Sequence, residues 1–395
     1  MKRILFLGGA NFQIPAIEEA KRMGLYVITC DYLPNNPGHK LADEYYNVST
    51  VDIPAVLRLA EKIKPDIIMA YASDPGAPVA AFVSEKYGLP SNPYAVVRNL
   101  SEKDLFRGFL QEHNFNVPRS MGLDESEIDT SLLDDFIYPL IVKPVDASGS
   151  KGVMKILEPS ELKIASKYAL SLSRKRRIII EEFVFCDGEQ LHGDGFVING
   201  NLAFYYLGDH HYNHKVNQFV PYCTTWPSKK AKTIIDAVGR EVAMAVKCVG
   251  LQNGPINIEA RVSVKGEIYI MEIGPRSGGN FVPQAIKYAT GFDMIKSSLD
   301  ILMGNIIKIP ILEKGCSAYY VVHSTHDGKL SKLSLSEKVM PYVKEFHQYK
   351  KFGEHCSSFQ GADAAIGVIL LAFDNTKEMN NIIDIMPSLI DLVIE

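Results

Sequence analysis

Two glutamates, Glu259 and Glu272, lie on neighbouring strand-like runs in the segment PINIEARVSVKGEIYIMEIG. Apolar and polar residues alternate from 256 to 264, which predicts a strand with one buried face. Lys265-Gly266 predicts a two-residue turn, and counting back from it sets Glu259 directly opposite Glu272. Opposed side chains have Cβ atoms about 5 Å apart, and like charges there are destabilising. We therefore expect a counter-charge beside the two carboxylates.

Two counter-charges fit this pattern. Arg261 lies on the same predicted face and could pair with the acids. A divalent cation could do the same, because Mg²⁺ takes carboxylate oxygens together with substrate phosphates. Arg276 and a glycine-rich loop follow Glu272 at once, which favours the metal. An error of one residue in the register would separate the acids.

A candidate phosphate loop lies in YPLIVKPVDASGSKGV, residues 138–153. A predicted strand presents Lys143 and is followed by Ser148, Gly149, Ser150, Lys151 and Gly152. Backbone N–H groups of such a loop can approach phosphate oxygens, and a lysine supplies charge. The Walker A spacing is absent, and an ordinary hairpin turn could have the same composition. The charge run 174–177 is typical of a solvated loop or helix end.

The run IIIEEFVFCDGEQ, residues 178–190, combines a predicted strand with acids. Glu181 or Glu182 could accept a hydrogen bond from adenine, Phe183 and Val184 could cover the ring, and Glu189 could bind ribose hydroxyls. By itself, the segment is better explained by an edge strand with solvated acids.

Residues 1–100 alternate predicted strands and helices, which indicates a parallel sheet covered by helices. Its ligand edge would lie near Gly8, Gly9, Asp31 and Asp74. The turn reads Gly-Gly-Ala-Asn and does not match GxGxxG, which disfavours a dinucleotide site.

Beyond residue 100 the pattern predicts a helix that begins at Ser101 as N-cap, and then strands in hairpin order. Asn199-Gly200 predicts a type I′ turn. A helix over 228–250 precedes the hairpin of the two glutamates. The last 85 residues contain strand-like runs and a helix-like run, 378–394, that Pro387 should break or kink.

The composition is that of a soluble protein of several domains. The chain has 395 residues, 47% of them hydrophobic, and a net charge of −4. The sequence lacks the basic stripe that is typical of nucleic-acid-binding proteins. It also lacks an apolar run of about 18 residues, which a membrane-spanning helix would need. The apolar run at the N-terminus is too short for a signal peptide. The six cysteines are scattered, which is typical of reduced thiols in the cytoplasm.

Taken in order, these pieces resemble the ATP-grasp superfamily, which includes biotin carboxylase, the carbamoyl phosphate synthetase large subunit and L-amino acid ligases. The resemblance covers nearly the whole chain and rests on Lys103, Lys143, the glycine-rich loop, Glu-Glu-Phe-Val, Gly-Glu, Glu259 and Glu272-x-x-x-Arg276. It implies a mixed α/β and α+β fold. The expected parts are a Rossmann-like domain (1–100), a nucleotide-binding lobe (101–190), a catalytic lobe with the metal site (191–310) and a small α+β subdomain (311–395).

The resemblance also implies roles. Lys103, Lys143 and the loop 148–152 would bind the phosphates of ATP, Glu181 to Val184 the adenine, and Glu189 the ribose. Glu259 and Glu272 would hold Mg²⁺ or Mn²⁺, and Arg276 with Lys151 would act on the transferred phosphate. The family often has a metal-binding asparagine where this chain has Gly274. Asn257, opposite Gly274 in the predicted register, or water would take that place.

Candidate substrate contacts are His210, His214 and Lys215 in a loop that follows a strand, together with Ser277 and Gly278. That loop could contact an anionic substrate or be merely solvated. Its HxxxH spacing could indicate zinc, but no carboxylate or further ligand set accompanies the two histidines, which disfavours a metal.

The chemistry that the resemblance implies is an ATP-dependent carboxylate–amine ligase. A small-molecule carboxylate would form an acyl phosphate with release of ADP, and an amine would displace phosphate. A homodimer is expected by analogy with relatives. One alternative is a purine-biosynthesis ligase of the glycinamide ribonucleotide or carboxyaminoimidazole ribonucleotide synthetase type. Another is a non-catalytic ATP-binding subunit, against which the retained acids, lysines and Arg276 argue.

Overall fold

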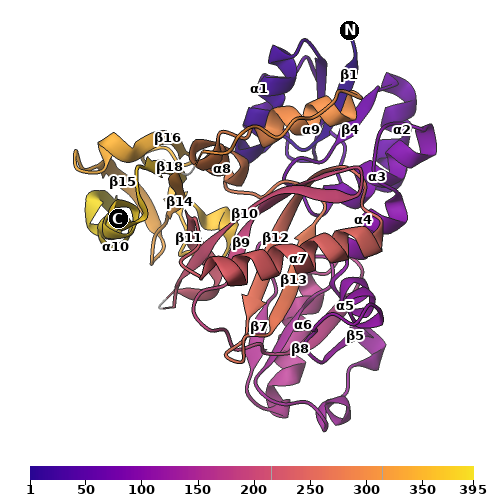
Figure 1. The fold of residues 1–395 in the computed structure, drawn as a ribbon, viewed down its shortest axis with the longest axis vertical. Helices are drawn as coiled ribbons and strands as arrows, with labels where there is room; N and C mark the ends of the chain where they lie inside the picture. The colour runs from indigo at the N-terminus through magenta and orange to yellow at the C-terminus, as the bar shows by residue number, and fades with distance from the viewer. Residues whose placement is uncertain (215, 314) are drawn as a thin grey trace.

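The computed structural model describes residues 1–214, 216–313 and 315–395. Lys215, one of the candidate substrate contacts, lies outside the described residues. Four β-sheets organise the described chain (Figure 1). Among its helices, none combines the length and the hydropathy that crossing a bilayer requires.

The first sheet is parallel, as the sequence predicts, with the strand order β3-β2-β1-β4. Helices cover both of its faces, which explains why its central strands are apolar throughout. We call this sheet and its helices the first domain. Its elements are β1 (Arg3–Leu7), α1 (Ile14–Arg22), β2 (Tyr26–Cys30), β3 (Glu44–Tyr46), α2 (Ile53–Ile63), β4 (Ile67–Met69) and α3 (Gly76–Tyr87).

The turn after β1 is filled by the side chain of Gln13, which is 3% exposed. Its Oε1 accepts from the backbone N–H of Ala10 at 2.9 Å, and its Nε2 donates to the carbonyl of Tyr71 at 2.9 Å. A Cβ on Gly8 would lie 2.3 Å from Gln13 Oε1. The protein's own amide therefore occupies the inside of this turn.

A late helix completes the first domain. Helix α9 (Met294–Leu302) packs Ile295 and Leu299 into the cluster formed by β1, β4 and α1. In Figure 1 this orange helix lies beside the indigo α1. The chain thus returns to its first sheet after building most of the remaining fold.

The second sheet is antiparallel, in the order β5-β8-β6-β7, and helix α6 packs against it. The prediction that Ser101 caps a helix is wrong. Ser101 ends α4, where its hydroxyl donates to the carbonyl of Val97, and Glu102 precedes α5. The elements are α4 (Tyr94–Ser101), α5 (Lys103–Glu112), β5 (Ser120–Asp124), β6 (Leu140–Pro144), β7 (Met154–Ile156), α6 (Leu162–Leu172) and β8 (Arg177–Glu182).

The largest sheet has eight strands, in the order β13-β12-β9-β10-β11-β14-β18-β16. The predicted turn at Asn199-Gly200 joins β9 to β10, and both residues have positive φ. The elements are β9 (Leu191–Ile198), β10 (Asn201–Asn213), β11 (Asn217–Trp226), α7 (Lys232–Val249), β12 (Gly254–Val262), β13 (Ile268–Gly274), α8 (Val282–Thr290), β14 (Cys316–Val322), β16 (Val343–Gln348) and β18 (Gly367–Phe373).

A small sheet, β17-β15-β19, closes the C-terminal part. It contains β15 (Gly328–Leu335), β17 (His355–Cys356) and β19 (Ile390–Ile394). Helix α10 (Thr376–Leu389) includes Pro387 near its end. The run predicted as one helix therefore changes into a strand at Ile390, because pairing with β15 takes over.

Candidate active site

A cleft of about 760 Å³ runs between the first domain, the second sheet and the large sheet. It is lined by Lys103, Lys143, the loop 148–151, Glu259, Glu272 and Arg276. These residues are far apart in sequence, and the fold brings them to one cavity. The size is within the range of small-ligand sites.

The hairpin β12–β13 places the two acids as predicted: Glu259 is paired with Glu272, and Asn257 with Gly274. The predicted turn is wrong, however. Pairing ends at Val262 and Ile268, so five residues connect the strands, and a bulge near Met271 shifts the register by one. The longer turn and the bulge shift the pairing in opposite directions, so the pairs at the site have the predicted register. The bulge also leaves the Met271 carbonyl free to accept from Arg107 at 2.9 Å.

The neighbouring strand β9 continues this polar face. Its register sets His192 opposite Glu259 and Asp194 opposite Asn257. Gln190, two residues before His192, donates to Glu259 Oε2 at 2.8 Å and accepts from Arg261 Nε at 2.8 Å. Arg261, considered above as a counter-charge, thus reaches the acids only through Gln190.

The electrostatics of the acid pair favour a cation. Burial, followed by the nearby Glu272, raises the pKa of Glu259 to about 7. The guanidinium of Arg276 is 3.7 Å from Glu272 Oε1, but it is also paired with Asp74. Two hard carboxylate oxygens with incomplete neutralisation fit Mg²⁺ or Mn²⁺.

We expect cation binding to release a proton from Glu259. A carboxyl with a raised folded-state pKa is protonated in the fold at a pH where the unfolded chain is ionised. Without the cation, stability therefore falls as the pH rises from about 4.5 to about 7. Titration calorimetry with Mn²⁺ at pH 6, in two buffers of different protonation enthalpy, measures the proton. Glu259→Gln should abolish this release, and equal heats in both buffers with the unaltered protein would contradict the assignment.

Arg276 is buried and its orientation is fixed by the first domain. Its Nε and Nη2 donate to the two carboxylate oxygens of Asp74, both at 2.6 Å. Burial opposes the charge of Asp74, but Arg276 outweighs it and holds the pKa of Asp74 below its usual value. A Cβ at Gly274 would lie 3.3 Å from both Arg276 Cζ and Asp74 Oδ1. A side chain at 274 would therefore lie tightly against this pair.

Asp194 anchors the loop that carries Arg276. It is fully buried, and its two oxygens accept from the backbone N–H of Gly278 at 2.8 and 3.1 Å. Oδ1 also accepts from Asn257 Nδ2 at 2.8 Å. Burial raises the pKa of Asp194 to about 7. The arrangement fixes the amide of Asn257, whose Nδ2 is also shared with His192 and the Gly193 carbonyl.

Asn257 lines the cleft, and with Nδ2 committed in this way its Oδ1 is the group available to a cation. We expect Asn257→Ala to raise the Mg²⁺ concentration needed for half-maximal ATP binding by about tenfold, which is the typical effect of losing a group that supports a metal site. ATP titrations at several Mg²⁺ concentrations provide the measurement, with the exposed Asn201→Ala as control. An unchanged Mg²⁺ dependence would remove Asn257 from the metal site.

The second sheet presents the lysines. Lys103 Nζ donates to the Ala147 carbonyl at 2.6 Å, and Lys143 Nζ is 2.5 Å from Glu181 Oε2. Burial lowers the pKa of Lys143 to about 8, against the opposing effect of Glu181. Glu181, 2% exposed, also pairs with Arg107 at 2.8 Å. Both carboxylate oxygens of Glu181 are therefore paired with cations. The sequence analysis had considered this carboxylate as a possible acceptor for adenine.

The end of β8 and the two residues after it line the cleft, from Glu181 to Val184. The ring of Phe183 lies between Lys155 Nζ, 4.4 Å from its centroid, and the Arg261 guanidinium, at 5.1 Å. Arg261 also donates to the Val184 carbonyl at 3.0 Å. Glu189 is exposed and does not line the cleft.

The glycine-rich loop contacts distant parts of the chain. Ser150 Oγ donates to the Phe219 carbonyl at 2.6 Å, and Lys151 Nζ is 3.6 Å from Asp363 Oδ2. Gly149 and Gly152 have positive φ, and a Cβ at 152 would lie 2.7 Å from Pro144. The loop therefore lies across the cleft and touches the C-terminal part.

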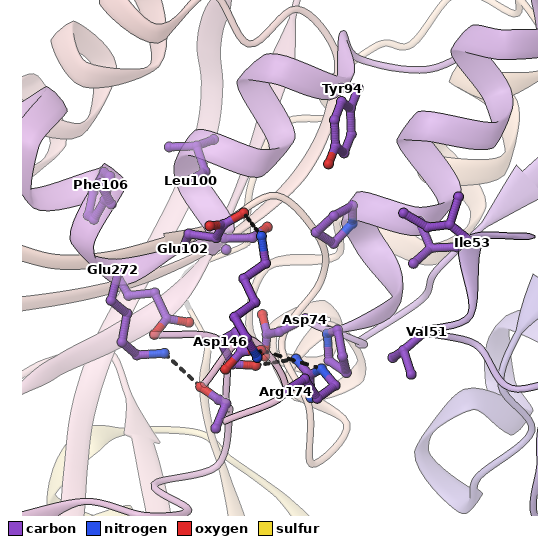
Figure 2. A pocket seen from close by; sticks show the side chains of 18 of the residues that line it. Val51, Ile53, Asp74, Tyr94, Leu100, Glu102, Phe106, Asp146, Arg174 and Glu272 are labelled. Atoms are coloured by element: carbon purple, nitrogen blue, oxygen red, sulfur yellow. Dashed lines mark hydrogen bonds and ion pairs between the residues drawn. The ribbon is translucent and has the colours of Figure 1, made fainter. Parts of the chain in front are cut away.

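A smaller pocket of about 250 Å³ adjoins the cleft and shares Asp74, Lys103 and Glu272 with it. Figure 2 shows Glu102, Asp146 and Arg174 on its walls. The charge run is more organised than a solvated loop. Each member pairs with a carboxylate: Arg174 with Asp146, Lys175 with Glu102, Arg176 with Glu125, and Arg177 with Asp104 and Asp124.

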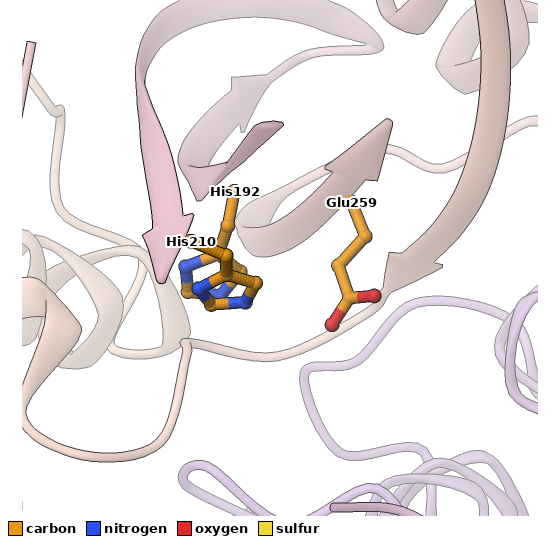
Figure 3. A group of neighbouring side chains, drawn as sticks. All are labelled: His192, His210 and Glu259. Carbon is orange, nitrogen blue, oxygen red and sulfur yellow. The ribbon is translucent and has the colours of Figure 1, made fainter. Parts of the chain in front are cut away.

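The histidine segment is a strand, and its interpretation as a loop is wrong. His210 lies in β10, is 3% exposed and stacks on His192 with ring centroids 4.0 Å apart (Figure 3). Burial lowers the pKa of His192 to about 3 and that of His210 well below its usual value. Ligand atoms of these rings and Glu259 lie within 4.8 Å of one another. One nitrogen of each ring is already hydrogen-bonded, His192 Nε2 to Asn257 and His210 Nδ1 to Thr224.

The other candidate substrate contacts lie outside the cleft wall. His214 is exposed in the turn after β10, whereas Ser277 is buried. Gly278 is held against Asp194, where a Cβ would lie 2.8 Å from Oδ1. Ser277 and Gly278 thus shape the Arg276 loop from behind.

Several site residues escaped the sequence analysis. Gln190, just before β9, and His192 and Asp194 within it recur at every second position and share one face, on which Gln190 and His192 line the cleft. That alternation was a usable signal. Arg107 gave none, because its partners Glu181 and Met271 belong to other elements.

A family model matches the middle of the chain. Residues 136–284 match the family model described as the ATP-grasp domain. The chain contains an ATP-grasp domain. The matched region includes Lys143, the glycine-rich loop, both acids and Arg276, whereas Asp74, Lys103 and Arg107 precede it.

The relatives bear one recurring name. The chain is 29% identical over 192 residues to a formate-dependent phosphoribosylglycinamide formyltransferase of Prochlorococcus marinus, covering 48% of this chain and 49% of the relative. It is 28% identical over 290 residues to the protein of the same name from Thioalkalivibrio sulfidiphilus, covering 69% of each. The match to the first of these relatives spans about half its length.

Solved structures with a similar fold cover the whole chain. An L-amino acid ligase from Bacillus licheniformis has a TM-score of 0.85 at 21% identity, covering 100% of this chain and 99% of that one. The biotin carboxylase domain of Hydrogenobacter thermophilus 2-oxoglutarate carboxylase, in complex with MgADP, has a TM-score of 0.79 at 14% identity, covering 99% and 90%. At these identities the likeness establishes the fold, and it confirms the mixed α/β and α+β architecture.

Proposed function

We propose that the protein is an ATP-dependent carboxylate–amine ligase that works through an acyl phosphate. One observation carries the proposal: Glu259 and Glu272 stand opposite each other in a cleft that also holds Lys103, Lys143, the glycine-rich loop and Arg276. These residue types are suited to binding and transferring phosphate rather than to abstracting a proton.

In the proposed reaction, Lys103, Lys143 and the loop 148–152 hold the phosphates of ATP. Glu259, Glu272 and Asn257 would hold Mg²⁺, which supplies neutralisation of the phosphate charge. A substrate carboxylate oxygen attacks the γ-phosphorus, the bond to the β–γ bridging oxygen breaks, and ADP leaves. The rate enhancement comes mainly from positioning and charge stabilisation.

In the second step, an amine attacks the carbonyl carbon of the acyl phosphate, and phosphate departs with the bonding electrons. The amine proton passes to solvent or to the released phosphate. Arg276, oriented by Asp74, would stabilise the phosphoryl oxygens in both steps. Lys151 would contribute when it exchanges Asp363 for phosphate.

The proposal assigns adenine to the segment from Glu181 to Val184, which lines the cleft. Glu181 would act there by orienting Lys143. Ribose contact by Glu189 requires the turn before β9 to move inward, because Glu189 does not line the cleft. A homodimer and a cytoplasmic location are further parts of the proposal and follow only from the family resemblance.

The test is release of ADP and phosphate from Mg·ATP in the presence of pooled carboxylates and amines. ADP formed only with a particular pair would establish the ligase and name its substrates. Formation of AMP and pyrophosphate would contradict the acyl phosphate. ATP binding without turnover in any pool would favour the non-catalytic alternative.

A purine-type ligase is the second candidate, because the named relatives act on phosphoribosylglycinamide. It requires a place for a phosphoribosyl group in the cleft. Adding glycinamide ribonucleotide to the same assay tests it directly.

A further inference from the structure

Gln190 lies between an arginine and one of the two acids of the cleft. Its side chain is 8% exposed and lines the cleft just before β9. Its Oε1 accepts from Arg261 Nε, and its Nε2 donates to Glu259 Oε2, both at 2.8 Å. A guanidinium only donates and an ionised carboxylate only accepts, so the amide satisfies both neighbours in one orientation alone. The amide nitrogen of Gln190 therefore faces Glu259.

Arg261 is itself held, which fixes the orientation of the amide. Its Nη1 donates to the Val184 carbonyl at 3.0 Å, and its guanidinium carbon is 5.1 Å from the centroid of the Phe183 ring. At the other end of the glutamine, the backbone carbonyl of Gln190 accepts from the N–H of His210 at 3.0 Å. Both ends of Gln190 are thus anchored, and its amide nitrogen is kept in place without help from the acid.

Each acid has one oxygen engaged with a protein group and one left over. Glu259 Oε2 is the oxygen that accepts from Gln190. Glu272 Oε1 is 3.7 Å from Arg276 Nη2. Within the described part of the chain, Glu259 Oε1 and Glu272 Oε2 have no hydrogen-bond or ion-pair partner. The two acids therefore present one unengaged oxygen each to a cation.

Cations differ in how many oxygens they take from a carboxylate. Mg²⁺ requires nearly octahedral geometry at short distances, and it is usually bound by one or two carboxylates together with water and phosphates. Ca²⁺ takes about six to eight oxygens at longer distances, and a carboxylate can bind it through both oxygens. A donor kept at Glu259 Oε2 opposes binding through both oxygens, because Oε2 would have to give up its hydrogen bond or share it with the ion.

We propose that Gln190 is a positioning residue that presents Glu259 to the cation through Oε1, and that it thereby selects Mg²⁺ or Mn²⁺ over Ca²⁺. The amide also separates the Arg261 guanidinium from the carboxylate, so that arginine does not take the place of the cation. The inference rests on the proposed ligase function, because it concerns the cation that accompanies ATP. It adds a determinant of cation choice to the two acids.

The experiment measures binding of a non-hydrolysable ATP analogue at increasing Mg²⁺ or increasing Ca²⁺ concentration. The ratio of the two half-saturating concentrations gives the cation preference without any turnover. Gln190→Met keeps the length of the side chain and removes both hydrogen bonds, and we expect it to reduce the preference for Mg²⁺ by about tenfold. Arg261→Met leaves the amide present but unheld, and it should shift the ratio in the same direction by less.

Gln218→Met is the matched control. Gln218 is a second glutamine that lines the cleft, and among the described residues it has no hydrogen bond to either acid. The same substitution there should leave the ratio unchanged. If Gln190→Met does not fold, Arg261→Met carries the test, and an unchanged ratio in that variant overturns the inference.

A reduced preference for Mg²⁺ in Gln190→Met, with the control unchanged, supports the inference. Equal ratios in Gln190→Met and the unaltered protein overturn it. Equal binding of the analogue with either cation in the unaltered protein also overturns it, and ADP release from Mg·ATP, measured separately, leaves the ligase function standing in both cases. Analogue binding that needs no divalent cation contradicts the metal site, and with it both the inference and the proposed reaction.

Discussion

Replacing Glu272 with glutamine should lower ligase turnover by about 10²–10³-fold, the scale of removing one preorganised electrostatic contact to a transition state. The carboxylate sits opposite Glu259 and beside Arg276, and the amide that replaces it has the same size without the charge. The loss should fall on kcat, while ATP affinity at saturating Mg²⁺ changes less. ADP release at several ATP and Mg²⁺ concentrations separates these quantities.

Glu267→Gln is the control for this variant. Glu267 belongs to the same hairpin, but it is exposed at the turn and does not line the cleft. Its replacement should leave turnover unchanged. Full activity in Glu272→Gln would remove the acid from the proposed phosphate and metal site.

Replacing Glu181 with glutamine should cost about 3–5 kcal/mol of stability, because two buried cations lose their shared anion. Burial by itself would raise the pKa of Glu181, but Arg107 and Lys143 lower it to about 2. A lowered folded-state pKa stabilises the fold above the unfolded value, and this contribution is lost as the pH falls from about 4.5 through about 2. The effect of the substitution should therefore be fully present at pH 7 and fade in acid.

Denaturant unfolding at several pH values measures this effect, and hydrogen exchange in β6 and β8 locates it. Glu182→Gln provides the comparison. Glu182 is the next residue of β8 and is less buried, and among the described residues its carboxylate accepts only from the backbone N–H of Ile137, at 2.9 Å. Similar losses in both variants would mean that the ion pairs contribute no more than the strand itself.

Sequence periodicity was sufficient where a strand has one buried face. It predicted that Glu259 opposes Glu272 and Asn257 opposes Gly274, and both pairings are confirmed. It did not predict how the hairpin achieves them: the strands are joined by five residues, and a bulge near Met271 leaves a carbonyl that accepts from Arg107 of α5. The missed bulge and the wrong turn length each shift the pairing by one residue, and the two shifts cancel for the pairs at the site.

Contacts between distant segments account for most of what the sequence left open. Asp74 and Arg276 are 202 positions apart, and nothing in the sequence around either residue indicates that the two form an ion pair. His210 looked like a loop residue because polar residues surround it, yet its neighbours on β9 and β11 bury it. In these cases tertiary packing overrode the local composition.

The return of α9 to the first domain has a consequence for synthesis of the protein. About 270 residues separate the end of α1 from the start of α9, which packs into the same cluster as Ile4, Phe6 and Ile17. At translation rates of about 5–20 residues per second, the ribosome needs roughly 15–50 s to deliver α9 after α1. Throughout that interval the nascent first domain exposes an apolar face. The ribosome-bound chain is therefore a natural client for chaperones that shield such surfaces, and its first hundred residues alone would retain this exposed face.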